Sequence, residues 1–158
     1  MRRKVALASV IGVLVATSCG SPSPFPQDGS IPADMVVQLS RSACYGTCPV
    51  YGLTVKADGS VSFDGTEYTE TIGPANGRID EDTLKALLQE FKTAKFFELD
   101  DEYTSDDCAT DHPTVSTALT INGETKEIDH DTGCDAPQEL VTLEQRIDEV
   151  VGSERWVG

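Results

Sequence analysis

The residues of this chain best suited to chemistry are two cysteines, Cys44 and Cys48, with Pro49 directly after them. Two neighbouring thiolates are soft ligands that suit Cu(I), and a distant histidine such as His112 or His130 would complete a copper site. When oxidised, the same thiols would form a disulfide that closes the connection between two strands and removes about 2 kcal/mol of unfolded-state entropy. The spacing therefore leaves a redox or copper site and a structural disulfide as alternatives.

The residues after the second cysteine favour the structural disulfide. The Cys-x-x-x-Cys-Pro pattern is similar to the copper-chaperone motif of thioredoxin-like assembly factors, which carry it where a helix begins and so lower the pKa of a thiol. In this chain apolar and polar residues alternate from Tyr51 to Val55, as they do in a strand. We therefore expect a Cys44–Cys48 disulfide and keep thiol-redox or copper handling as the alternative function.

The start of the chain carries the marks of an export signal. Three basic residues at positions 2–4 precede an apolar run, residues 5–17, that is too short to span a bilayer as a helix. The run leads into Ala-Thr-Ser-Cys, which resembles a bacterial lipobox. This pattern predicts a lipoprotein signal peptide at residues 1–18 and a lipid on Cys19. We expect an exported, lipid-anchored protein of the bacterial cell envelope, and favour the outer membrane facing the periplasm over the inner membrane.

Loss of that signal would make an acidic chain more acidic. The full chain has 27 acidic and 12 basic residues and a formal net charge of −15. Removal of the three basic residues at positions 2–4 leaves nine against the same 27 acids, a net charge of −18. Because nucleic acid and anionic headgroups carry the same sign, we expect no nucleic-acid partner, and membrane contact through the lipid on Cys19.

The remaining cysteines form an even set if Cys19 carries lipid. Four thiols in an oxidising compartment allow three pairings. The dipeptide Asn122-Gly123 predicts a two-residue hairpin turn, and in that register position 108 falls opposite position 137, close to Cys134. This closeness favours a Cys108–Cys134 disulfide, whose loop of about 27 residues removes roughly 3.5 kcal/mol of unfolded-state entropy.

Acidic residues crowd the predicted loop at residues 100–113. Converging carboxylates can hold a hard cation such as Ca²⁺, but the spacing lacks the glycine and the terminal glutamate of an EF-hand loop. A solvated acidic loop is the interpretation that we favour, so we assign no metal site and no cofactor. The weaker metal candidates are Cys44 and Cys48 with His130, and Asp106, Asp107 and Asp111.

The hydrophobic pattern predicts an α+β domain over residues 34–158, after a Pro-, Ser- and Gly-rich tether at residues 19–33. Apolar stripes at helical spacing predict one helix from Asp80 and another from about Asp135, and Trp156 is expected to dock as a packing anchor. We expect an antiparallel sheet of about five to six strands with the two amphipathic helices packed on one face. The predicted strands cover residues 35–41, 51–55, 60–64, 67–72, 115–121 and 124–130.

The register of the second and third strands follows from their apolar residues. A three-residue loop with Gly59 in the left-handed conformation sets Val55 opposite Val61 and Leu53 opposite Phe63. A two-residue turn would instead set the apolar residues opposite polar ones. We therefore predict the three-residue loop.

From position 41 the chain reads RSACYGTCPVY, and Asp58-Gly59 follows in the next hairpin. This stretch resembles the bacterial family called domain of unknown function 6438, with its pattern R-x-x-C-[FY]-G-x-C-P-x-Y and then a strand with Asp-Gly. Phe96-Phe97, Tyr103 and Arg155-Trp156 also look similar, so the resemblance extends over residues 35–157. The resemblance implies an exported or lipid-anchored domain with no established activity.

The chain lacks the sequence motifs of common enzyme sites. It has no nucleophile-elbow serine, no HExxH and no phosphate-binding glycine loop. We therefore expect no catalytic residues and no enzyme. The predicted function is that of a non-catalytic binding or structural module, stabilised by two disulfides, with an envelope protein as partner.

Overall fold

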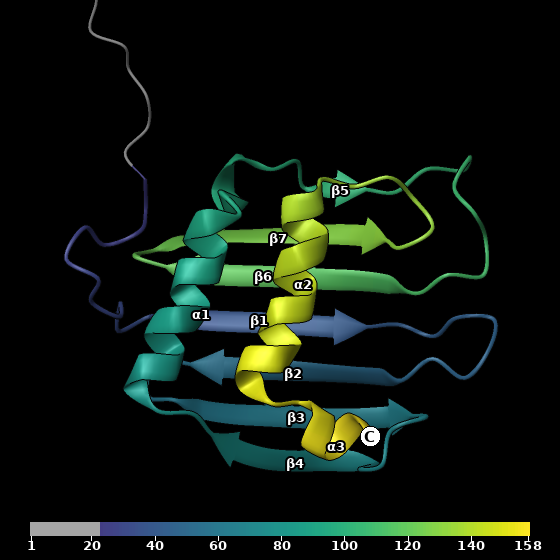
Figure 1. The fold of residues 1–158 in the computed structure, drawn as a ribbon, viewed down its shortest axis with the longest axis horizontal. Helices are drawn as coiled ribbons and strands as arrows, with labels where there is room; N and C mark the ends of the chain where they lie inside the picture. Colours follow the sequence, from purple (N-terminus) through teal and green to yellow (C-terminus); the bar gives the residue numbers. More distant parts are fainter. Residues whose placement is uncertain (1–22) are drawn as a thin grey trace, which may run out of the picture.

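The structure is a computed structural model that describes residues 23–158 (Figure 1). The predicted signal peptide and the predicted lipidation site, Cys19, lie outside the described residues. Within residues 23–158, no helix has the length and apolar character needed to cross a membrane.

One open sheet of seven strands forms a layer, and the helices lie across one of its faces (Figure 1). The strand order is β4-β3-β2-β1-β6-β7-β5, and only β5 runs parallel to its neighbour. The predicted α+β class is confirmed, but the strand count is higher than the predicted five to six. The strands are β1 (Val36–Arg41), β2 (Val50–Lys56), β3 (Ser60–Glu67), β4 (Gly73–Arg78), β5 (Glu102–Tyr103), β6 (Thr114–Ile121) and β7 (Glu124–Asp131).

The two edge strands account for the differences from the predicted sheet. The fourth strand is not at residues 67–72, because residues 68–72 form the turn that leads into β4. Strand β4 reads Gly-Pro-Ala-Asn-Gly-Arg, which contains no β-branched residue, and its proline is tolerated because the strand lies at an edge. Strand β5 has two residues, too few to show an alternating pattern.

The predicted turns are confirmed. Val55 pairs with Val61 and Leu53 pairs with Phe63, as the three-residue loop requires. Gly59 has φ +81°, and a Cβ atom there would lie 2.3 Å from the backbone oxygen of Ile79, so both conformation and space require glycine. At the other hairpin Ile121 pairs with Glu124 across the Asn-Gly turn.

The helices begin and end at the residue types that the sequence provides for this. Helix α1 (Glu81–Thr93) starts where the Asp80 carboxylate accepts the backbone N–H of Thr83 at 2.8 Å. Helix α2 (Gln138–Val151) ends at Gly152 in the left-handed conformation. The short 3-10 helix η1 (Phe96–Glu98) follows α1, and α3 (Glu154–Val157) follows α2.

Residues 23–33 lie against the domain, which differs from the extended tether expected from their composition. The ring of Phe25 is only 7% exposed and packs edge-to-face on Phe97, with ring centroids 5.7 Å apart. The side-chain amide of Asn122 donates to the carbonyl of Pro24 at 2.8 Å. The contacts of Phe25 and Pro24 place this segment at the end of the domain where the β6–β7 turn lies.

Candidate functional site

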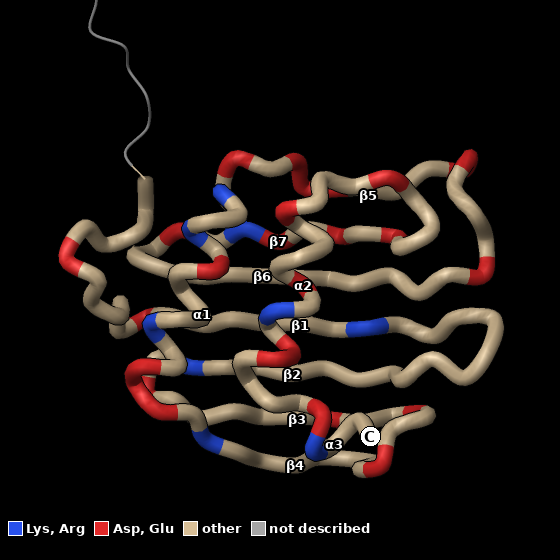
Figure 2. The backbone as a smooth tube through the Cα atoms, viewed as in Figure 1, with Lys and Arg blue, Asp and Glu red and all other residues tan. Residues whose placement is uncertain are grey.

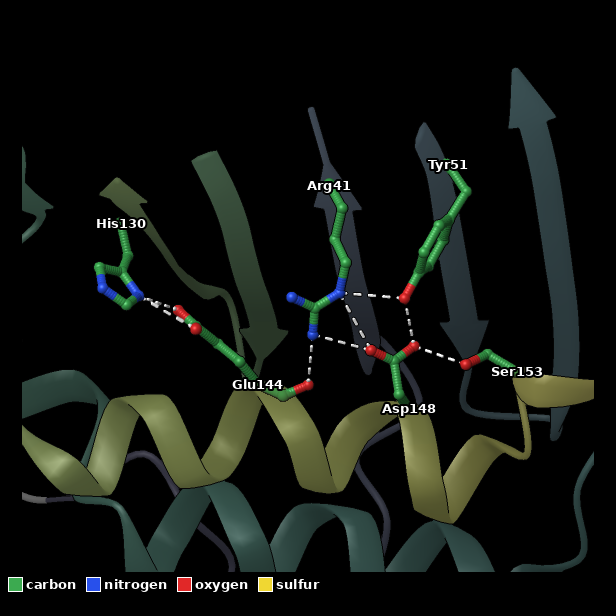
Figure 3. Close-up of polar contacts among 6 residues, drawn as sticks. All are labelled: Arg41, Tyr51, His130, Glu144, Asp148 and Ser153. Atoms are coloured by element: carbon green, nitrogen blue, oxygen red, sulfur yellow. Dashed lines mark hydrogen bonds and ion pairs between the residues drawn. The ribbon is translucent and has the colours of Figure 1, made fainter. Parts of the chain in front are cut away.

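A network of polar side chains joins the sheet to α2 (Figure 3). The guanidinium of Arg41 donates to Asp148 Oδ2 from Nε at 3.1 Å and from Nη2 at 2.8 Å. The hydroxyl groups of Tyr51 and Ser153 donate to Asp148 Oδ1 at 2.7 and 2.6 Å. Arg41 also donates from Nη2 to the backbone carbonyl of Glu144 at 3.1 Å. The carboxylate of Asp148 is therefore the common acceptor of three side chains.

The fold places these residues without long or flexible connections. Arg41, the last residue of β1, pairs directly with Tyr51 of β2, so both side chains project from the same face of the sheet. Asp148 lies in the last turn of α2, and Ser153 follows the glycine that ends this helix. The Tyr51 ring also stacks on Phe63 at 5.3 Å, and Phe63 stacks on Trp156 at 5.1 Å, which confirms Trp156 as a packing anchor.

The surroundings keep the Tyr51 hydroxyl protonated. The residue is 5% exposed. Burial raises the pKa of Tyr51 well above its ordinary value, and the neighbouring Asp148 carboxylate raises the pKa further. The phenol therefore remains a hydrogen-bond donor to Asp148 at neutral and moderately alkaline pH.

A second buried pair lies one helical turn away on α2 (Figure 3). Nδ1 of His130 lies 3.0 Å from both carboxylate oxygens of Glu144, and the two side chains are each 4% exposed. Burial raises the pKa of the Glu144 carboxyl, although the hydrogen bond with His130 opposes this effect. Helix α2 thus presents two acids four residues apart, Glu144 and Asp148, each paired with a basic residue of the sheet.

These two pairs are suited to holding α2 on the sheet rather than to reacting with a substrate. His130 and Glu144 are almost fully buried, and the side chains of Arg41 and Asp148 are 22% and 20% exposed. The acceptor atoms of Asp148 are engaged by partners within the domain. We call Arg41, Tyr51, Asp148 and Ser153 the latch.

The cysteines pair as the sequence predicts. The structure has disulfides Cys44–Cys48 and Cys108–Cys134, with Cα atoms 5.7 and 4.8 Å apart. The third copper ligand considered above, His130, is instead bonded to Glu144. Residues 23–158 contain no group of three or more His, Cys, Asp or Glu side chains that could hold a metal ion, so neither the thiols with His130 nor Asp106, Asp107 and Asp111 form such a group.

Both disulfides lie at one end of the sheet, where β1, β3 and β7 finish (Figure 1). Four loops lie at this end, which we call the disulfide end: residues 42–49, 68–72, 104–113 and 132–137. Backbone hydrogen bonds connect three of them, from Tyr45 N–H to the Asp111 carbonyl at 3.1 Å and from Ala109 N–H to the Gly133 carbonyl at 3.3 Å. Residues 68–72 are held instead by α3, through hydrogen bonds from Glu70 N–H to the Val157 carbonyl at 3.2 Å and from Thr71 N–H to the Trp156 carbonyl at 2.9 Å.

The disulfide end has an unusual surface. The exposed large hydrophobic residues of the described chain, Tyr45, Tyr68 and Ile72, all belong to these loops and are 87%, 55% and 65% exposed. The same loops contain no lysine or arginine. Their acidic residues are Glu70, Asp106, Asp107, Asp111 and Asp135.

The face of the sheet opposite the helices offers a different surface. It carries a shallow trough of about 460 Å³, lined mainly by small and polar residues that include Gln38, Ser40, Thr54, Ser62 and Asn76. No exposed large hydrophobic residue of the described chain lines this trough. Among the described residues, the exposed large hydrophobic side chains therefore lie at the disulfide end and not on this face.

A family model described as Domain of unknown function (DUF6438) matches residues 35–151, well over half of the chain. The chain belongs to this family. The DUF6438 match runs from the start of the sheet to the end of α2 and includes the latch except Ser153, the His130–Glu144 pair and both disulfides. A comparison with curated proteins finds no match.

Sequence reasoning missed the latch and the second pair, although one signal for the pair was present. Glu144 lies within the apolar stripe of α2, between Leu143 and Ile147, at a position that faces the core. His130 similarly continues the inward alternation of Ile128 in β7. A charged residue in each of two core-facing patterns indicates a buried pair.

Proposed function

We propose that this DUF6438 protein is a lipid-anchored, non-catalytic module of the cell envelope that binds a basic envelope protein through its disulfide end. The observation that carries the proposal is the exposure of Tyr45, Tyr68 and Ile72 in loops that lie at the same end of the sheet and contain no lysine or arginine. Single exposed hydrophobic residues are ordinary, but a group of them surrounded by charged residues is typical of an interaction surface.

The construction of the disulfide end suits binding. A surface whose loops are held by two disulfides, by hydrogen bonds between three loops and by hydrogen bonds from residues 68–72 to α3 loses little conformational freedom when a partner docks. Tyrosine adds a large apolar area and a polar hydroxyl with few rotatable bonds, which is why it is enriched at protein interfaces. The loops therefore form a preorganised surface.

The charge of the disulfide end favours a partner of the opposite charge. Its five acidic residues and its lack of cations favour a basic protein surface and disfavour an acidic one. Because these acids are exposed, their attraction should weaken with increasing salt. We therefore expect the binding surface of the partner to have lysine or arginine residues around an apolar centre.

The polar groups of the domain interior support a non-catalytic role. The latch and the His130–Glu144 pair use their hydrogen-bonding groups within the domain, and they hold α2 on the sheet. Strongly shifted pKa values also occur in structural networks, so the shifts of Tyr51 and Glu144 do not by themselves indicate catalysis.

Site-specific photo-crosslinking in cells tests this proposal. A photoreactive amino acid at position 45 or 72 should capture the same protein, whereas the same group at Gln89, exposed on α1, should not. The captured protein, once purified, should bind the domain more weakly at high salt. Equal capture from all three positions, or binding that does not respond to salt, would contradict the proposal.

A further inference from the structure

The opposite end of the domain carries the N-terminal segment and the lysines. We call it the tether end: residues 23–30, the β6–β7 turn, and the last turn of α1 with η1. The domain has five lysines in its described residues, and three of them, Lys85, Lys92 and Lys95, line hollows together with residues 23–30. The other two are Lys56, at the end of β2, and Lys126, near the start of β7, so both belong to the same end of the strands.

The two ends therefore differ in charge. In Figure 2 most lysine and arginine segments lie on the side from which the N-terminal segment enters, among acidic segments, and others lie on α2, on β1 and beside α3. The loops on the opposite side show acidic segments. The tether end also holds Asp28, Glu98 and Glu124, and Glu90 lies in the last turn of α1, so its charge is mixed and its acids outnumber Lys92 and Lys95. Lys92 and Lys95 are exposed, and neither forms a salt bridge with a described residue.

We propose that the domain contacts an anionic membrane surface through its tether end, with Lys92 and Lys95 toward the headgroups and the disulfide end pointing away. This inference rests on the lipid anchor at Cys19 that is part of the proposed function. It adds a second membrane contact to that anchor, and it leaves the proposed binding surface facing the envelope space.

The reach of the chain supports this orientation. Pro24 is held by Asn122, and Phe25 is held by Phe97, so the chain is fixed to the tether end five residues after Cys19. Five fully extended residues span at most about 18 Å. The eight residues of β6 extend over roughly 26 Å, so the disulfide end lies farther from Pro24 than the lipid can be.

The net charge of the chain disfavours anionic headgroups, but the difference in charge between the two ends favours the same orientation. Lysines close to an anionic leaflet are attracted to it, and the attraction fades over a distance of about 8–10 Å at physiological salt. The disulfide end, with five acids and no cation, would be repelled by the same surface. A rotation that brought that end to the membrane would also require Phe25 to leave its contact with Phe97.

Hydrogen exchange on the lipidated full-length protein in vesicles of phosphatidylcholine and phosphatidylglycerol tests the orientation. Compared with a Cys19→Ala chain mixed with the same vesicles, we expect slower exchange in residues 24–30 and 92–98 and unchanged exchange in residues 42–49 and 68–72. Protection at the disulfide end, equal protection at both ends, or protection at neither end of a vesicle-bound lipidated chain would overturn the orientation alone. A mature chain whose mass shows no lipid would overturn both the orientation and the lipid anchor of the proposed function.

A matched pair of variants separates the lysines from net charge. The double variant Lys92→Gln/Lys95→Gln and the control Thr47→Glu/Thr110→Glu each lower the net charge by two at exposed positions. We expect the first to lose most of the protection of residues 92–98 on anionic vesicles and the control to keep it. Equal protection in both variants would overturn the role of Lys92 and Lys95 as the membrane-facing cations.

Discussion

Asp148 accepts hydrogen bonds from side chains that belong to three different parts of the chain: β1, β2 and the segment after α2. Its loss would leave the Tyr51 hydroxyl without its acceptor and the Arg41 guanidinium without its counter-ion in a largely buried site. Removing one partner of such a pair costs more than the pair contributes, because the remaining charge is poorly hydrated. The stability of the α2–sheet contact should therefore depend strongly on this single carboxylate.

Replacement of Asp148 tests the latch directly. We expect Asp148→Ala to lower the free energy of unfolding by about 2–3 kcal/mol, between the values for exposed and buried ion pairs, because the side chains of Arg41 and Asp148 are about one-fifth exposed. Urea unfolding followed by circular dichroism measures this change. The control Asp107→Ala, at an exposed loop position, should change stability by less than about 0.5 kcal/mol. Equal effects of the two variants would contradict the structural role of the latch.

The raised pKa of Tyr51 predicts how stability depends on alkaline pH. Because the folded state holds the phenol protonated while the unfolded state releases its proton near pH 10, the contribution of this group is complete below pH 10 and declines above it. Tyr51→Phe removes the titrating group. Its Tm should therefore fall less steeply than that of the wild type as the pH rises from about 9 to 11. Tyr45→Phe is the control, because Tyr45 is 87% exposed. Its Tm should fall with pH as steeply as that of the wild type. If the Tm of Tyr51→Phe falls with pH as steeply as that of the wild type, Tyr51 is not the group responsible for this pH dependence.

At the scale of elements, the packing of α3 on the sheet depends on one small residue. Gly77 of β4 lies beneath this helix, and a Cβ atom there would come within 2.6 Å of Arg155 Nη2 and 2.9 Å of Trp156 Cη2. Arg155 in turn lies over the Trp156 ring, 4.0 Å from its centroid. The absence of a side chain at Gly77 lets the aromatic stack reach the edge of the sheet.

Gly77→Ala should displace α3 from β4. We expect a loss of stability of about 1–3 kcal/mol and a red shift of the Trp156 fluorescence, because the indole would become more exposed. The matched control is Gly52→Ala in β2, where an added Cβ meets nothing within 4 Å. If both variants leave the emission of Trp156 unchanged, the close packing of α3 on Gly77 is not important for the fold.

The two disulfides should contribute unequally to stability. They close segments with sequence separations of 4 and 26 residues. In the chain-entropy model these correspond to about 2 and 3.5 kcal/mol. Thermal unfolding should therefore show a larger loss for Cys108→Ser/Cys134→Ser than for Cys44→Ser/Cys48→Ser. The reverse order would show that the short loop stabilises the native state by contacts beyond chain entropy.

Local elements of this fold were predictable, whereas contacts between distant segments were not. Gly59, Asn122-Gly123 and Asp80 each specify a turn or a helix start through their own conformational preferences, and the structure has these features where expected. Strand β4 has no such signal. It forms because its pairing with β3 overrides the weak strand preference of its residues. The Tyr51–Asp148 bond joins residues 97 positions apart, and Asp148 alone reads as an ordinary polar residue at a helix end.

At the scale of the whole molecule, the tether end and the disulfide end lie at opposite ends of the strands. The tether end carries Phe25, Lys92 and Lys95, and the disulfide end carries the exposed hydrophobic residues among acids. The latch and the aromatic stack lie next to the disulfide end and hold α2 and α3 on the sheet. The proposed membrane contact and the proposed partner site can therefore be occupied at the same time.

The affinity of the captured partner for variants of the disulfide end tests the central claim most directly. The double variant Tyr45→Ala/Ile72→Ser removes two exposed side chains without touching the core, and Gln89→Ala is the control on α1. We predict that the double variant raises the Kd at least about tenfold and that the control leaves it unchanged. An unchanged Kd for Tyr45→Ala/Ile72→Ser, in a chain whose unfolding curve matches the wild type, would contradict binding through the disulfide end.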